Sequence, residues 1–153
     1  MARQNVLVAI VVVASILHTV SFTATTSANL TADTSATAYD VLEQNNLPRG
    51  LLPQGVQSYT LNAGGALEVT LPSECNFFVT VAGKQYQFRY ARNIGGVIRS
   101  GSIGQVHGVR MQVAFAWLGL IQVDHVGDQL NIQVEKSTQS FPYNAFSQSP
   151  RCS

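Results

Sequence analysis

From Val56 onward, apolar and polar residues alternate with a period of two along most of the chain. This period is typical of β-strands, in which successive side chains point to opposite faces of the sheet. Turn-forming residues interrupt the alternation about every ten residues and no helical period lies between the runs, which favours antiparallel pairing over a βαβ arrangement. We therefore predict an all-β fold, a small closed antiparallel β-barrel of about seven or eight strands.

Two stretches of this pattern stand out. The cleanest alternation covers residues 109–117, which we predict to be one uninterrupted strand that includes Phe115 and Trp117. Residues 94–108 before it are rich in glycine, and we expect one broken or bulged strand there, because glycine weakens a strand and often marks a bulge. Such a segment would thin one wall of a barrel and let a mouth open in it.

The segment before the strands predicts a short helix. Thr37 is a favourable N-cap, and Asp40 stands three residues further on, where an acidic side chain completes a capping box. Asn45 and Pro48 end the helix. Residues 47–55 then form an apolar turn with two prolines, which we expect to cover one end of the core.

The N-terminus has the proportions of a secretory signal peptide. Arg3 precedes the apolar run 6–17, which at about a dozen residues is shorter than the roughly 20 that a membrane-spanning helix needs. We predict a signal peptide over residues 1–28, a disordered leader over 29–36 and a single β-barrel domain over 37–153. An uncleaved membrane anchor is the alternative, but no polybasic flank follows the run.

Cys75 and Cys152 both lie in the mature part of the chain. In an oxidising compartment, two cysteines in a small domain most often form one disulfide, and we predict that these two are paired. The disulfide would fix the C-terminal tail, residues 140–153, which has no strong strand or helix pattern. A glycosylation sequon is present at Asn29, close to the expected mature N-terminus.

The charge balance excludes one class of partner. Only 11% of the residues are charged, and loss of Arg3 with the signal peptide leaves eight basic and eight acidic residues. A neutral chain lacks the positive field that nucleic-acid binding requires, so we predict no nucleic-acid partner. Beyond the N-terminal run, no stretch is apolar and long enough to span a bilayer.

Several short motifs follow one another along the chain, namely AYDVL at 38–42, LPRGLLP at 47–53, LPSEC at 71–75, IGG at 94–96, GSI at 101–103, GV at 108–109, Trp117, Ile121, FP at 141–142, Phe146, Pro150 and Cys152. Together they resemble a plant family known as "domain of unknown function 538", in its secreted branch. The resemblance covers about residues 38–152. It implies a closed β-barrel with an N-terminal helix, a plant source and a location in the apoplast, the cell wall or the endomembrane lumen. The family has been compared with lipid-binding, bactericidal/permeability-increasing-type proteins and proposed to act as an esterase on chlorophyll-like substrates, but it supplies no agreed catalytic residue.

Signals for catalysis and for metal binding are weak. His107 and His125 are the histidines of the mature chain, with Asp124 beside the second, but residues 100–104 lack the first glycine of a G-x-S-x-G motif. That motif also needs a strand-to-helix turn, which an all-β chain lacks, although a triad assembled from distant loops stays open. The histidines and cysteines have no recognised metal-ligand spacing. We predict no catalytic residue, no metal and no cofactor, and we favour a non-enzymatic protein.

Arginine and aromatic residues supply the candidate binding site. Four of the six mature arginines lie between Arg89 and Arg110, where they can bind a phosphate, sulfate or carboxylate or simply support acidic neighbours across the strands. The aromatic residues can fill the core, or a barrel of about eight strands can hold one small apolar ligand among them. We expect an arginine to bind the head group at the rim and the tail to lie inside. The predicted ligand-binding residues are Phe88, Met111, Trp117, Arg89, Arg99 and Arg110.

The sequence therefore predicts a secreted plant protein that binds an apolar or amphipathic small molecule or a lipid head group without catalysis. The alternatives are an esterase or other hydrolase acting on a lipid-like or chlorophyll-like ester, and a cell-wall protein-interaction module.

Overall fold

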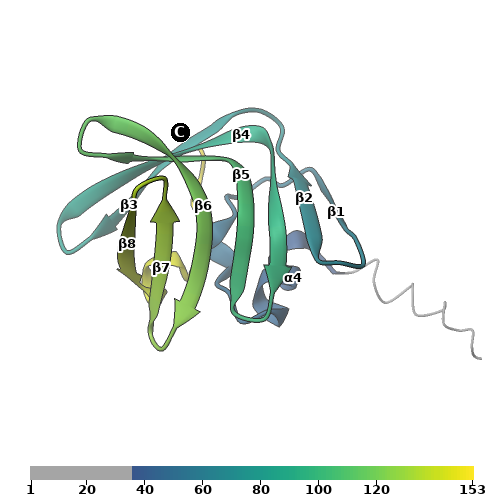
Figure 1. Cartoon of the computed structure of the whole chain (residues 1–153). Coiled ribbons are helices and arrows are strands. Elements are labelled where there is room, and N and C mark those ends of the chain that lie inside the picture. Colours follow the sequence, from purple (N-terminus) through teal and green to yellow (C-terminus); the bar gives the residue numbers. More distant parts are fainter. Residues whose placement is uncertain (1–35) are drawn as a thin grey trace, which may run out of the picture. The chain divides into compact units, whose positions relative to one another are not determined.

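One antiparallel sheet of eight strands carries the fold in the computed structural model, which describes residues 36–153. Hydrogen bonds join the strands in the order β1-β2-β4-β5-β6-β7-β8, and β3 pairs with β4 as well. Figure 1 shows the long central strands bending, with β1 and β2 on one side and β6 to β8 on the other. The strands are β1 (Ser58–Leu61), β2 (Ala66–Thr70), β3 (Cys75–Val81), β4 (Lys84–Arg99), β5 (Ser102–Val113), β6 (Ala116–Val126), β7 (Gln129–Val134) and β8 (Ser137–Pro142).

The predicted antiparallel β-rich class is confirmed, but hydrogen bonds do not close the sheet, so a closed barrel is not supported. Among the described strands, β1 pairs only with β2 and β8 pairs only with β7. The 3-10 helix η2 (Tyr143–Phe146) contacts both β3 and β8. In the described part of the chain, β3 and β8 are not paired with each other. The short helix therefore lies where further strand pairing would be needed to close the sheet.

The glycine-rich stretch belongs to two strands and not to one broken strand. Residues 94–99 are the second half of β4, Ser100 and Gly101 form a tight turn, and residues 102–108 are the first half of β5. Strand pairing across this hairpin contains register shifts, so the expectation of a bulge in this region is confirmed.

The predicted strand over residues 109–117 is wrong, because the chain turns in the middle of it. Val113 pairs with Ala116 and the two residues between them form the tip of the β5–β6 hairpin. Ala114 has a positive φ of 58°, and the Phe115 side chain is 99% exposed. No glycine, asparagine or proline marks this turn, so the apolar alternation runs through it without a break in the sequence pattern.

The predicted N-terminal helix is α4 (Ala38–Gln44), and its capping box is formed as expected. The Thr37 hydroxyl accepts from the Asp40 backbone N–H, and the Asp40 carboxylate accepts from the Thr37 N–H at 2.8 Å. Val41 and Leu42 of the helix are buried against the sheet. The 3-10 helix η1 (Arg49–Leu51) follows α4 in the chain. Together these segments cover one face of the core.

The Cys75–Cys152 disulfide is present and joins β3 to the C-terminal segment. Backbone hydrogen bonds support the same attachment, because the Ser153 N–H donates to the Asn76 carbonyl and the Gln54 N–H donates to the Pro150 carbonyl, both at 2.8 Å. The C-terminal tail is thus held by the disulfide and by main-chain contacts. The signal peptide, all of the leader except its last residue and the sequon at Asn29 lie outside the described residues.

Candidate binding site

An apolar cavity of about 60 Å³ lies between the sheet and the helical segments that cover it. Apolar side chains and the glycine Gly95 surround it, and its one polar side chain is Tyr90, whose hydroxyl donates to the Leu51 carbonyl at 2.6 Å. Burial raises the pKa of this hydroxyl well above its ordinary value. A cavity with this lining stays dry and suits an apolar group. Its walls include Leu42, Leu67, Phe88, Leu120, Ile132 and Phe146.

The wall of this cavity is interrupted where β5 separates from β6. Ile103 pairs with Val123 and Arg110 pairs with Gly119, so six residues of β5 stand against three of β6 between the two pairs. The surplus residues bulge away from the neighbouring strand. Between these two pairs the described residues of β5 and β6 have no partners in the strand register.

Two residues with positive φ produce this bulge. Gln105 has a φ of 50° and Gly108 a φ of 84°. A side chain at position 108 would place its Cβ 2.5 Å from the Asn93 carbonyl oxygen, a distance that real Cβ atoms do not tolerate. Glycine is therefore required at this position both for the backbone conformation and for the close approach of β4.

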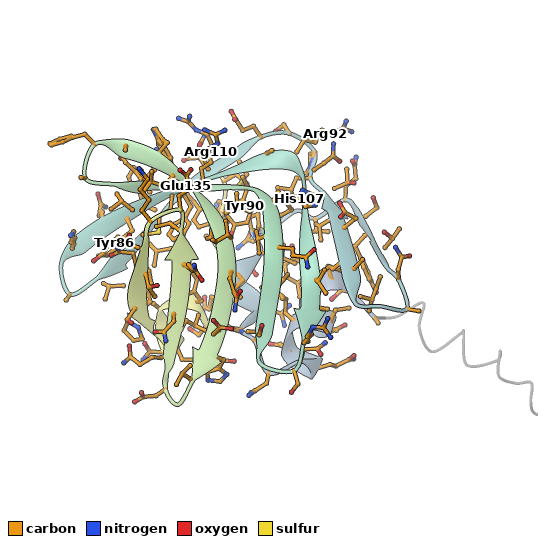
Figure 2. All side chains as sticks on the ribbon, viewed as in Figure 1. Tyr86, Tyr90, Arg92, His107, Arg110 and Glu135 are labelled. Carbon is orange, nitrogen blue, oxygen red and sulfur yellow. A yellow bond between two sulfur atoms is a disulfide. The ribbon has the colours of Figure 1, made fainter. Side chains whose placement is uncertain are left out.

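A polar groove of about 330 Å³ lies on the outer side of the same bulge. Val106, Val109 and Leu120 line the groove and the apolar cavity alike, so these three side chains form the partition between them. Val109 and Leu120 are buried, and Val106 is half-buried. The charged residues around the groove are Glu74, Arg89, His107, Arg110 and Glu135. Figure 2 labels three of them, His107, Arg110 and Glu135.

Two arginines in the groove stand opposite each other without a carboxylate partner. Arg89 of β4 pairs with Arg110 of β5, and like charges in directly opposed positions destabilise a sheet. The Arg89 Nε–H donates to the Asn76 amide oxygen at 3.2 Å, and no hydrogen bond or ion pair of Arg110 is found within residues 36–153. Glu135 shares the groove, but its carboxylate accepts from the Gly119 N–H at 2.7 Å. The arginine pair is thus available to an anion.

A histidine–glutamate pair lies at one side of the groove. His107 Nε2 is 3.0 Å from Glu68 Oε2, and both side chains are half exposed. The two residues meet across Gly95, which pairs with both of them in the sheet. A Cβ at Gly95 would lie 2.8 Å from the Glu68 carboxylate oxygen, so the glycine leaves the space through which the carboxylate reaches the imidazole.

The structure divides the six predicted binding residues among different places. Phe88 and Met111 pair across the strands on the inner face, both almost fully buried, and Phe88 lines the apolar cavity. Trp117 lies on the other face, where its ring stacks under Arg89. Arg99 is exposed at the far end of β4, opposite Ser102, and does not line the groove. Arg89 and Arg110 lie together on the outer face, as Phe88 and Met111 do on the inner face.

The sequence-based prediction of the site missed the partition and the groove residues. Val106, Val109 and Leu120 read as ordinary core positions, because nothing in an alternating pattern tells which inward residue borders a cavity. The sequence offers His107 as a candidate for catalysis or metal binding, whereas the structure places it in the lining of a groove. The glycine-rich stretch was the one available signal, since Gly108 marks the bulge at which the partition lies.

The described residues show no arrangement typical of a catalytic triad or of a metal site. Within residues 36–153 no serine or threonine hydroxyl is hydrogen-bonded to His107 or to His125. The Nδ1 atom of His125 lies 2.7 Å from the Asn46 carbonyl oxygen. The same residues contain no group of three or more histidine, cysteine, aspartate or glutamate side chains placed to hold a metal ion. None of the helices in this part of the chain is long and apolar enough to cross a membrane.

Comparison with protein families gives a match over most of the chain. The family model described as "Protein of unknown function, DUF538" matches residues 38–147, which is most of the chain from the start of α4 to the end of η2. The motif resemblance is thereby confirmed, whereas a plant source and a secreted branch stay predictions. No curated protein and no solved structure matches this chain.

Proposed function

The chain belongs to the DUF538 family, and we propose that it binds an amphipathic small molecule with an anionic head group. The head group binds Arg89 and Arg110 in the outer groove. The apolar part passes the partition beside Val106 and enters the cavity. One observation carries this proposal, namely that the apolar cavity and the charged groove share Val106, Val109 and Leu120 at the point where β5 leaves β6.

The arginine pair supports an anionic head group over a neutral one. Two guanidinium groups in opposed positions repel each other, and an anion between them removes the repulsion while accepting charge-assisted hydrogen bonds. Each such bond contributes about 1.5–3 kcal/mol when a charged group takes part. Carboxylate, sulfate and phosphate share the chemistry that a guanidinium recognises.

The cavity supports a short apolar group. At about 60 Å³ it exceeds the space of a single water molecule, but it is smaller than the usual site of a drug-sized ligand. Each methylene that leaves water contributes about 0.8 kcal/mol, so even a short acyl segment gives useful affinity. A medium-chain carboxylate such as octanoate is therefore a suitable probe.

Fluorescence titration of Trp117, the only tryptophan of the chain, tests the proposal with octanoate and its neutral counterpart octanol. Wild type should bind octanoate saturably, and Arg110→Ala should weaken octanoate by about 1–2 kcal/mol, roughly tenfold, because one charge-assisted contact is lost. The binding of octanol should not change. Arg99→Ala is the matched control, an exposed arginine of the same hairpin outside the groove, and it should bind both ligands as wild type does.

Two results would overturn the proposal. If wild type shows no saturable binding of octanoate, the pocket is not a ligand site. If Arg110→Ala and Arg99→Ala lose the same affinity, or if octanol weakens as much as octanoate, the arginine pair has no role in recognising the head group.

An esterase acting on a similar amphipathic ester is the second candidate, and the His107–Glu68 pair beside the groove is the observation that favours it. Such a pair supplies a general base and the group that orients it, but a nucleophile or an activated water must complete the site. Turnover of p-nitrophenyl octanoate that is lost in His107→Ala would favour this candidate. Binding of octanoate that persists without turnover favours a binding protein.

The proposed setting is an extracellular or lumenal one. The disulfide is compatible with an oxidising compartment, where such bonds form and persist. A plant source and release into the apoplast or cell wall belong to this proposal as well.

A further inference from the structure

The tip of the β5–β6 hairpin exposes an aromatic ring that has no role in the core. Phe115 is 99% exposed, and its two neighbours Ala114 and Ala116 are exposed as well. Including Val113 and Trp117, five consecutive apolar residues form the end of this hairpin. Exposure of a whole phenylalanine ring is unfavourable in water by about 1.5–3 kcal/mol relative to burial, which suggests that the ring has a partner outside the chain.

A second hairpin lies beside this tip and adds a positive charge. Phe78 and Lys84 of the β3–β4 hairpin line one hollow together with Val113 and Ala114 of the β5–β6 hairpin. Figure 1 shows both hairpins extending from the same side of the sheet. Phe78 is 51% exposed. The Lys84 ammonium lies over the Tyr86 ring, and no carboxylate of residues 36–153 lines this hollow.

We propose that these two hairpin ends form a docking surface for an anionic lipid bilayer, with Phe115 inserted below the head groups and Lys84 among them. Aromatic rings are favoured at the membrane interface, and a basic residue near an anionic surface contributes to binding. Trp117 then lies at the level of the interface, where its amphipathic indole is also favoured.

A lipid surface fits these residues better than a protein partner does. A single ring that projects from a narrow turn is convex and offers little flat area, whereas a specific protein interface buries about 800 Å² on each side. A fluid bilayer needs no matching pocket. The proposal is independent of the ligand site, because Phe115 and Lys84 line neither the groove nor the apolar cavity.

Quenching of Trp117 by brominated lipid tests the surface directly. The full chain is mixed with vesicles of phosphatidylcholine and phosphatidylserine in equal amounts, whose acyl chains carry bromine. Trp117 emission should be quenched, and Phe115→Ser should weaken this quenching with about tenfold lower vesicle affinity, since one buried ring is lost. The apolar N-terminal run is present in both chains, so it does not account for a difference between them.

Two further variants complete the experiment. Lys84→Gln should lower affinity about fivefold for the phosphatidylserine vesicles and leave pure phosphatidylcholine vesicles unaffected. Leu61→Ser is the matched control, because Leu61 is a 46% exposed apolar residue of β1 that contributes to neither hairpin. It should be quenched as wild type is.

The proposal is overturned if wild-type Trp117 is not quenched, or if Phe115→Ser and Leu61→Ser behave alike. It is also overturned if the chain without vesicles forms a dimer that Phe115→Ser dissociates, because the occupant would then be a second copy. Phe115→Ser should keep its affinity for octanoate in vesicle-free buffer, which separates this surface from the ligand site.

Discussion

The guanidinium of Arg89 lies over the ring of Trp117, with its central carbon 4.2 Å from the ring centroid. Arg89 is thereby held on the outer face of the sheet, beside Arg110 and at one end of the groove. Because Trp117 is the only tryptophan of the chain, its emission reports on the position of one of the two proposed head-group residues.

Arg89→Ala should shift the emission of Trp117 to longer wavelength before any ligand is added, because the indole loses its cover and becomes more hydrated. Octanoate should then no longer change the emission. The free energy of unfolding in urea should fall by only about 0.5–1 kcal/mol, the usual contribution of a cation–π contact near the surface. An emission spectrum identical to that of wild type would contradict this placement of Arg89, and Arg99→Ala serves as the control.

Gly108→Ala should destabilise the fold more than Gly127→Ala does. Both glycines have positive φ, but a Cβ at position 127 meets nothing within 4 Å, whereas a Cβ at position 108 meets the Asn93 carbonyl oxygen at 2.5 Å. The shared conformational strain cancels in the comparison, and the steric conflict should add about 1–3 kcal/mol to the loss at Gly108. Urea unfolding of both variants measures the difference. Equal losses would show that β4 and β5 do not approach closely at the bulge.

Cys152→Ser should lower the free energy of unfolding by about 2–4 kcal/mol, because the Cys75–Cys152 disulfide closes a long loop in the unfolded chain. Reduced wild type should show the same loss, and reduction should not destabilise the variant further. Two free thiols in protein folded under oxidising conditions would refute the pairing.

Tyr90→Phe should remove both a buried hydrogen bond and a pH dependence. Loss of the bond to the Leu51 carbonyl should cost about 1–2 kcal/mol at neutral pH. Burial raises the pKa of Tyr90 above its ordinary value of 10.0, so the unfolded chain releases this proton at lower pH than the folded chain does. Stability is therefore fully present below pH 10 and falls as the pH rises above it, and this slope should be smaller in the variant.

Tyr86→Phe is the control for this prediction, since no hydrogen bond of the Tyr86 hydroxyl is found within the described part of the chain. Its stability should match that of wild type at neutral pH. A Tyr90→Phe chain with the wild-type slope above pH 10 would show that another group causes the alkaline loss.

The fold could be predicted from the sequence where local chemistry and burial agree. The capping box of Thr37 and Asp40 depends on neighbours in sequence, so the sequence predicts it. The alternation of β2, β3 and the first half of β4 depends on one buried face, so the sequence predicts these strands too. The turn at Ala114 was not, because apolar residues form it. Strand β8 was missed since four of its six residues are serine, threonine or glutamine, and its pairing with β7 rather than its own pattern makes it a strand.

The candidate site was only partly readable. Arg89 and Arg110 could be chosen together because both lie on neighbouring strands. The sequence pattern predicts Trp117 in the interior with Phe88. The period of two does not show that the chain turns before Trp117, so it does not show on which face of the sheet Trp117 lies. Whether strands close a barrel depends on contacts between distant edges, for which the sequence pattern has no signal.

A crystal structure with octanoate brominated at its far end tests the proposed ligand site most directly, because anomalous scattering locates the bromine. We expect the bromine inside the apolar cavity, next to Phe88 and Ile132, and the carboxylate between Arg89 and Arg110. Bromine found only on the outer surface, or none bound at saturating ligand concentration, would contradict the binding of an amphipathic molecule across the partition.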